Sequence, residues 1–365
     1  MNIRIIRSAA AGAGLTALGL AALLLPARTA AAPAPPHVRT LTLARVDRKC
    51  FEYPSAPGSS PVYPTWAVPS IRGGFDDPRG VKFAHFGVDV AAPHDRAKVY
   101  AVVTGRIWHV RRKGANARFI LSPSGTLRST RYDYWHVDLT RVAPGAHVTR
   151  GEWIGRVVAG QNHVHLSEWN PVCGFIDPRR PTGILRDPAN RERPSIDDLE
   201  AYVADEAAFG PHGKDVADAS TPMALDGLHG RVDLRARVWD MPVHRTPRWP
   251  QQPLMVAGLR SWIAPATDPL LRVGSPIVPF VGGRLIPPAQ VDDFYAPGTY
   301  RENECFTRPQ GSCATRLIVH VGGHGVDTTR IPNGAYQFCV AAVTIRNVSH
   351  HRCWPIAIDN PGSAG

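Results

Sequence analysis

The sequence predicts an all-β protein with two β domains. Its 365 residues include 35 prolines and 33 glycines, and both residue types destabilise helix interiors. The apolar segments are short, β-prone and bounded by glycine or proline, which is typical of strands and turns. With 44% hydrophobic and 20% charged residues, the composition allows packed cores and excludes wholesale disorder. This length favours two domains over one.

The first 32 residues have the order of a secretory signal peptide. Arg4 and Arg7 precede an apolar stretch at 9–25, and Pro26 and small residues follow it. We therefore expect export to a secreted or periplasmic location, cleavage of the signal peptide 1–32 and no stable membrane span afterwards. An uncleaved anchor is the alternative, because the stretch is nearly long enough to span a bilayer. Residues 33–59 would form an N-terminal extension, which leaves open a role as a latency device.

The chain is basic, with a formal net charge of +12 that falls to +9 without the three arginines of the signal peptide. Basic proteins often bind nucleic acid. The longest run of basic residues is only three, at 111–113, and an exported protein rarely meets nucleic acid. We therefore expect an anionic cell-envelope partner, no nucleic acid and a monomeric chain. An arginine-rich coding bias with no partner is the alternative.

The even number of cysteines agrees with an oxidising compartment, where disulfides form. Their spacing does not determine the pairing. We predict one long-range disulfide at the ends of the first domain and two local ones in the second: Cys50–Cys173, Cys305–Cys313 and Cys339–Cys353.

The first β domain is predicted to span residues 60–190. Residues 64 onward show short β-prone runs and no amphipathic helix, so the domain should be a sheet or barrel-like assembly. The expected strands lie at 98–110 (interrupted by Gly105), 118–121, 132–137 and 147–158.

A composition change separates this domain from the second one. Acidic, small and proline residues accumulate at 191–226, which we interpret as a linker with a possible short helix at 196–209. From 231 to 238, apolar residues alternate with charged ones, which predicts a strand with one buried face. Asn333-Gly334 then predicts a turn before a β-prone run at 335–345. Residues 227–359 should therefore form a β-sandwich.

Candidate metal ligands gather in the first domain. Zinc hydrolases use about three protein ligands and keep an open position for water. His85 and Asp89 flank Gly87, and His163 and His165 stand two apart, so both can face one side of a strand. His85 and Asp89 need a bend, which Gly87 permits. A further candidate is His136.

Single motifs of this kind also occur by chance. Ordinary polar positions on sheet faces are therefore the alternative interpretation of these residues. His229 and Asp233 repeat the His-x3-Asp spacing, and we interpret them as structural. His320, His324 and Asp327 lie in a glycine-rich segment where a helix is disfavoured, so we expect loop histidines.

The order of the motifs is more specific than any one of them. HFGVDVAAP, KVYAVVTGRI, YWHVDLTRVAPGAHVTRGEWIGRVV and HVHL follow one another within residues 64–188. This series resembles the lysostaphin/LytM-type zinc endopeptidases, with their H-x-G-x-D, Tyr-x-His and H-x-H motifs. The resemblance covers about a third of the chain and marks residues 60–190 as a zinc metallopeptidase domain.

The resemblance implies particular roles. His85, Asp89 and His165 would bind Zn²⁺, while His136 and His163 would act on the water and on the developing oxyanion. Two histidines and one carboxylate leave a fourth zinc position for water, whose pKa the metal lowers. The residues that flank H-x-H depart from the family pattern, with Gln161-Asn162 before it and Leu166-Ser167 after it. These departures bear on substrate choice more than on metal binding.

The function implied is an exported zinc-dependent endopeptidase that hydrolyses peptide bonds in peptidoglycan cross-links or stem peptides. A non-catalytic cell-envelope regulator or wall-binding protein of the same fold is the alternative. Residues 227–359 resemble Ig-like sandwiches of exported enzymes, through GRVDLRARVWD and PNGAYQFCVAAVTIRN. That domain would be a wall-, glycan- or protein-binding module, or else a spacer or lid.

Overall fold

The computed structural model describes most of the chain beyond residue 70, together with two short segments before it. The described ranges are 48–51, 64–65, 71–80, 83–111, 114–185, 192–204, 221–240, 254–281, 284–296, 298–299, 317–323 and 325–362. The predicted signal peptide 1–32 and the predicted Cys305–Cys313 pair lie outside the described residues. Strands dominate the described ranges, which confirms the all-β fold class.

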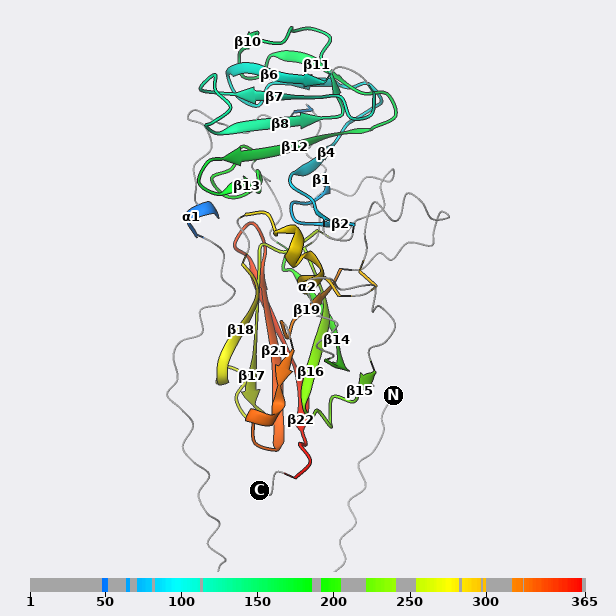
Figure 1. The fold of residues 1–365 in the computed structure, drawn as a ribbon, viewed down its shortest axis with the longest axis vertical. Coiled ribbons are helices and arrows are strands. Elements are labelled where there is room, and N and C mark those ends of the chain that lie inside the picture. The colour runs from blue at the N-terminus through cyan, green and yellow to red at the C-terminus, as the bar shows by residue number, and fades with distance from the viewer. Residues whose placement is uncertain are drawn as a thin grey trace, which may run out of the picture. The chain divides into compact units, whose positions relative to one another are not determined.

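An eight-stranded antiparallel sheet carries the first part of the fold, with β6, β7, β8 and β12 side by side (Figure 1). Its order is β1 (Ile71–Gly73), β4 (Val88–Ala91), β12 (His163–Asn170), β8 (Arg131–Trp135), β7 (Arg118–Ser122), β6 (Gly105–Arg111) and β10 (His147–Val148), with β13 (Gly174–Ile176) also paired to β12. Two smaller sheets accompany it: β5 (Lys98–Tyr100), β11 (Trp153–Val157) and β9 (Val137–Asp138), and β2 (Pro78–Gly80) with β3 (Phe83–Ala84).

The central strands of this sheet have one apolar face. Phe119 and Leu121 of β7 and Tyr132 and Tyr134 of β8 are fully buried. Because side chains alternate along a strand, the residues between them face the opposite side of the sheet. One face therefore anchors the hydrophobic core, and the other face is free to carry polar side chains.

The second part of the fold is a sandwich of two antiparallel sheets. The first contains β15 (Pro222–Met223), β14 (Ser195–Val203), β16 (Arg231–Trp239), β19 (Ile318–His320) and β20 (Val326–Asp327). The second contains β18 (Val273–Val281), β17 (Gly258–Pro265), β21 (Gly334–Val343) and β22 (Ser349–Ile358). Leu234 and Val238 of one sheet and Leu259, Phe338 and Val340 of the other belong to one buried cluster. Its assignment to the Ig-like class stays a prediction.

Short helical segments complete the described elements. They are α1 (Arg48–Phe51), α2 (Val291–Phe294) and the 3-10 turns η2 (Pro288–Gln290) and η3 (Thr328–Arg330). None of the helices in the described ranges is long and apolar enough to cross a membrane.

The prediction of a helix at 196–209 is wrong for 196–204, the part of this range that the structure describes. Residues 195–203 form β14, which pairs with β16 through Ile196↔Val238 and Tyr202↔Asp233. A register shift between Asp197 and Glu200 places Ile196, Leu199 and Ala201 inward, so their spacing resembles that of a helix. Pairing with β16 outweighs local propensity here, and the predicted linker contains a strand of the sandwich.

The polar face predicted for 231–238 is also partly buried. Arg235 donates to Asp233 at 2.6 Å, and His320 Nδ1 lies 2.7 Å from the other oxygen of Asp233. His320 therefore stands at the end of β19, buried against β16, and not in a loop as expected. The opposite charges are buried as pairs, so their mutual attraction offsets part of the free-energy cost of removing them from water. Among the described residues, His229 bonds locally to the Gly227 carbonyl, and His324 lies outside the described residues.

Two of the three predicted disulfides are confirmed. Cys50 is bonded to Cys173, which ties α1 to the turn after β12. Cys339 and Cys353 face each other directly across β21 and β22 and are bonded. Disulfides of this kind fit a secreted or periplasmic protein.

A buried ion pair should dominate the stability of the β12–β13 region. Arg180 bonds Glu168 through two nitrogens, at 2.7 and 2.8 Å, and neither side chain is exposed. Arg180→Ala would leave an uncompensated buried carboxylate, so we expect about 3–5 kcal/mol less free energy of unfolding. Denaturant unfolding at neutral pH measures it. Arg128→Ala, at an exposed position, is the control, and an equal effect of both substitutions would contradict the assignment.

Candidate metal centre

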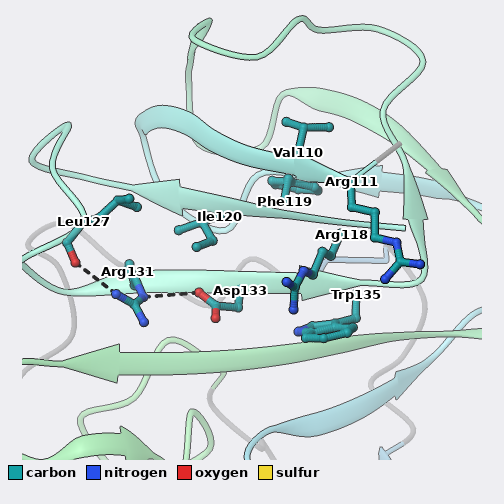
Figure 2. A pocket seen from close by; sticks show the side chains of 9 residues that line it. All are labelled: Val110, Arg111, Arg118, Phe119, Ile120, Leu127, Arg131, Asp133 and Trp135. Atoms are coloured by element: carbon teal, nitrogen blue, oxygen red, sulfur yellow. Dashed lines mark hydrogen bonds and ion pairs between the residues drawn. The ribbon is translucent and has the colours of Figure 1, made fainter. Parts of the chain in front are cut away.

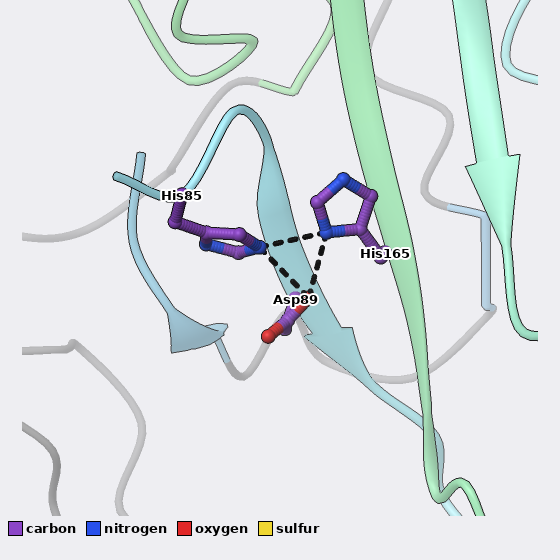
Figure 3. A group of neighbouring side chains, drawn as sticks. All are labelled: His85, Asp89 and His165. Carbon is purple, nitrogen blue, oxygen red and sulfur yellow. Dashed lines mark hydrogen bonds and ion pairs between the residues drawn. The ribbon is translucent and has the colours of Figure 1, made fainter. Parts of the chain in front are cut away.

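Strand pairing brings the predicted ligands together from distant parts of the sequence. Asp89 lies on β4 and His165 on β12, directly opposite each other in the register. His85 stands in the short connection between β3 and β4. The chain turns in this connection, so the side chain of His85 lies next to those of Asp89 and His165 (Figure 3).

The three side chains present nitrogen and oxygen atoms to one point. His85 Nε2 lies 2.7 Å from His165 Nδ1 and 3.3 Å from Asp89 Oδ1. His165 Nδ1 lies 3.2 Å from the same Asp89 oxygen. All three residues are buried, and their candidate ligand atoms form a possible metal site. The structure thus assembles the residues that the sequence selected, while their role as ligands stays a prediction.

Hydrogen bonds on the far side of each imidazole hold the rings in place. His85 Nδ1 donates to the Gly74 carbonyl at 2.6 Å, which leaves the lone pair of Nε2 for the site. His165 Nε2 lies 2.8 Å from Ser167 Oγ and can donate to it, which leaves Nδ1 for the site. Such outer hydrogen bonds fix the tautomer and the orientation of metal-binding histidines.

The electrostatics favour the protonation states that a cation needs. Burial, aided by the positive charge of Arg79, lowers the pKa of His85 to about 3. Burial also lowers the pKa of His165. Burial alone would raise the pKa of Asp89, but Arg79 and the neighbouring histidines hold it well below its ordinary value. Neutral imidazoles and an ionised carboxylate are the forms that bind metals.

The donor set fits zinc. Tetrahedral ligands at about 2.0–2.1 Å from zinc are separated from one another by about 3.3 Å. The two histidine–carboxylate separations, 3.2 and 3.3 Å, match this value, and the histidine–histidine separation of 2.7 Å is shorter. Two ring nitrogens that face each other so closely need a cation or a proton between them, because their lone pairs repel. Two histidines and a carboxylate would leave one tetrahedral position for water or substrate.

Arg79 also reaches this site, and the sequence analysis did not identify it. Its Nη2 contacts Asp89 Oδ2 and lies 2.9 and 3.0 Å from the two nitrogens of His85. The β2–β3 hairpin folds Arg79 back toward His85. Since the guanidinium occupies Oδ2, Asp89 offers only Oδ1 toward the two histidines.

His136 and His163 stand beside the candidate ligands, and the roles that the resemblance implies for them stay predictions. His163 Nε2 lies 3.7 Å from Asp89 Oδ1, and the rings of His136 and His163 are 4.6 Å apart. Each donates Nδ1–H to a backbone carbonyl, His136 to Ala115 and His163 to Gln161, so Nε2 is the nitrogen that can take up a proton. His136 has φ +63°, and such strained conformations of non-glycine residues cluster at functional sites.

Gly87 is needed for a different reason from the one expected. Its φ is not in the left-handed region. A Cβ at this position would lie 2.6 Å from the Leu166 carbonyl oxygen and 2.8 Å from His165 Nε2. The missing side chain therefore allows the turn before β4 to approach β12 closely.

Gly87→Ala should consequently weaken zinc binding. The added methyl group must push β12 or the His165 ring aside, so we expect a loss of tenfold or more in zinc affinity, roughly 1.4 kcal/mol. Zinc titration against a competing chelator measures it. Gly227→Ala is a matched control, because a Cβ there meets nothing within 4 Å. Equal affinities in both variants would contradict the close-approach argument.

Asp77 supports the loop that positions His85. Its carboxylate accepts hydrogen bonds from the backbone N–H groups of Gly74 and Met255, the latter at 2.8 Å, while the Gly74 carbonyl accepts from His85. Burial raises the pKa of Asp77 to about 6. The folded chain therefore binds more protons than the unfolded chain between about pH 4 and pH 6, and stability is lost as the pH rises through this window.

Asp77→Asn should remove this pH dependence. Relative to the wild type, the free energy of unfolding of the variant should rise by about 2 kcal/mol between pH 4 and pH 6.5. Denaturant unfolding at both pH values, with the metal removed by a chelator, measures the change. A constant difference between the two proteins at both values would show that Asp77 does not titrate in this window.

Comparison with known proteins finds partial likenesses to solved structures at low sequence identity. No protein-family model and no curated protein sequence matches the chain. The catalytic domain of lysostaphin, an antimicrobial peptidase from Staphylococcus simulans, is similar at 20% identity over 30% of this chain and 89% of that one, with a TM-score of 0.25. The M23 protein EnpA from Enterococcus faecalis is similar at 19% identity over 34% of this chain and 98% of its catalytic domain, with a TM-score of 0.28. A zinc-containing peptidase from Vibrio cholerae shows 23% identity over 30% of this chain and 36% of that one, with a TM-score of 0.26.

Proposed function

We propose that this chain is an exported zinc-dependent endopeptidase that hydrolyses peptide bonds in peptidoglycan cross-links or stem peptides. The observation that carries the proposal is the convergence of His85 Nε2, Asp89 Oδ1 and His165 Nδ1 on one point. His136 and His163 flank this point, and each ring is oriented by a bond from Nδ1 to a backbone carbonyl. Metal ligands and proton-transferring groups next to one another are the requirement for metal-assisted hydrolysis.

Each side chain has a separate task in this proposal. His85, Asp89 and His165 hold the zinc, which when bound supplies the Lewis acidity for activating water and for polarising the scissile carbonyl. Nε2 of one of the flanking histidines accepts the proton of the attacking water, because a neutral imidazole is a suitable base near neutral pH. The other histidine, when protonated at Nε2 as well, donates a hydrogen bond to the developing oxyanion. The bonds from Nδ1–H to backbone carbonyls leave Nε2 of each ring as the atom that takes up or gives the proton.

Export and the role of the sandwich belong to the same proposal. The two observed disulfides support an oxidising location, and the residues 1–32 would provide the signal peptide. We infer that the sandwich, which contains β14 and β15 in addition to the predicted residues 227–359, is Ig-like and binds the wall or another envelope component. The chain would act as a monomer.

Hydrolysis of purified peptidoglycan tests the activity. The mature protein should release new amino termini, a chelator should stop the release, and added Zn²⁺ should restore it. Release that continues in the presence of a chelator would contradict zinc-dependent hydrolysis. A zinc-loaded protein that releases nothing would favour the non-catalytic regulator or wall-binding protein instead.

A further inference from the structure

A basic pocket lies on the eight-stranded sheet, at the strands β6, β7 and β8. It has a volume of about 400 Å³ and is lined by Arg111, Arg118 and Arg131, together with Asp133, Trp135 and apolar side chains (Figure 2). The pocket residues come from β6, β7 and β8 and from the turn between β7 and β8. Three guanidinium groups against one carboxylate make its lining strongly basic.

The pocket begins next to the candidate metal centre. Asp89 pairs with His165, His165 with Trp135, Trp135 with Arg118, and Arg118 with Arg111, so these residues form one row across five strands. The Trp135 ring lies 6.2 Å from the His165 ring. Neighbouring strands are about 4.8 Å apart, which puts Arg118 about 10 Å and Arg111 about 14 Å from His165 across the sheet.

The arginines of the pocket differ in the partners they already have. Arg131 donates to the Leu127 carbonyl and lies 3.5 Å from Asp133. The Arg118 guanidinium lies over the Trp135 ring, 4.4 Å from its centroid. Among the described residues no carboxylate lies within ion-pair distance of Arg118 or Arg111. Both side chains are exposed, so their N–H groups are accessible to a ligand.

We propose that this pocket binds a carboxylate of the substrate peptide and so makes the enzyme selective for acidic peptides. This inference rests on the proposed peptidase function. A guanidinium that lies over an aromatic ring keeps N–H groups that can bind a carboxylate in a strong charge-assisted pair. An extended peptide advances about 3.3 Å per residue, so the recognised carboxylate lies about three or four residues from the bond that is cleaved.

Arg118 is the principal anchor in this proposal. It stands closer to the metal centre than Arg111, and unlike Arg131 it is not shared with Asp133. A peptide is the occupant that the position favours, because the row of residues leads straight from the pocket to the metal ligands. A phosphate-containing wall polymer would use the same guanidinium chemistry without needing that alignment.

Binding of paired peptides tests the inference without relying on turnover. The probes are a stem-type peptide with a glutamate and the same peptide with glutamine in its place, titrated calorimetrically at low salt. The zinc-loaded mature chain with His136→Ala is used, so that the probes are not consumed. We expect at least tenfold tighter binding of the glutamate peptide, and nearly equal binding of both peptides after Arg118→Gln.

Arg128→Gln is the matched control, because Arg128 is exposed on the turn between β7 and β8 but does not line the pocket. It should keep the preference for the glutamate peptide. Equal binding of both peptides to the parent chain, or tighter binding of a phosphate polymer than of the acidic peptide, would overturn the inference. Circular dichroism and zinc content verify that Arg118→Gln stays folded.

The two proposals can fail separately. Chelator-sensitive cleavage of peptidoglycan with no preference between the probes would support the peptidase function and contradict carboxylate binding in the basic pocket. An Arg118-dependent preference for the glutamate peptide in a protein that cleaves no peptidoglycan would support carboxylate binding in the pocket and contradict the peptidase function.

Discussion

His165→Ala should abolish both zinc binding and hydrolysis. The substitution removes one of three candidate ligand atoms and leaves His85 and Asp89, which cannot hold a tetrahedral ion by themselves. Loss of a group that only supports a ligand costs tenfold to a hundredfold in metal affinity, so loss of the ligand itself should cost more than about a hundredfold. Zinc titration against a chelator and release of amino termini from peptidoglycan measure the two effects.

His229→Ala provides the control for this substitution. His229 is an exposed histidine of the sandwich whose Nδ1 bonds to the Gly227 carbonyl, and its removal should change neither zinc affinity nor activity. Unchanged zinc affinity in His165→Ala, with the fold preserved, would show that the metal is not held at this site.

His136→Ala should keep the zinc and lose turnover. The His136 ring lies beside His163 and is not among the three residues whose ligand atoms converge. Removing a general acid or base usually lowers the rate by about 10²–10⁴-fold. Zinc content should therefore stay near the wild-type value, while kcat for peptidoglycan hydrolysis falls by this factor.

The contrast between the two variants is the informative result. If His136→Ala and His165→Ala lose zinc equally, the division into ligands and proton-transferring residues is wrong. If His136→Ala keeps both zinc and turnover, the proton must be handled by another group, with His163 the remaining candidate.

Much of the fold follows from local patterns in the sequence. The strands at 118–122 and 131–135 were predictable because both segments are short β-prone runs rich in aromatic and β-branched residues. The strand at 195–203 was not, because a register shift breaks its alternation and makes Ile196 and Leu199 resemble one helix face. Only the pairing with β16 identifies it, and pairing partners are not readable from a single strand.

The candidate site was also predictable only in part from the sequence. The ordered motifs selected all five histidine and aspartate positions, since each motif carries its own spacing. Arg79 was missed because the β2–β3 hairpin, not a motif, brings it to Asp89 and His85. Arg111 and Arg118 stand apart in the sequence, and only the register of β6 and β7 aligns them with the metal centre. Chemistry that depends on cross-strand alignment needs the structure.

Anomalous X-ray diffraction at the zinc edge, from crystals of the zinc-loaded mature protein, tests the central claim most directly. We expect one strong peak within bonding distance of His85 Nε2, Asp89 Oδ1 and His165 Nδ1. His136 and His163 should lie near this peak but outside bonding distance. A zinc-loaded crystal with no peak at this position, or with its peak elsewhere in the chain, would contradict the assignment of the metal centre and with it the proposed hydrolase.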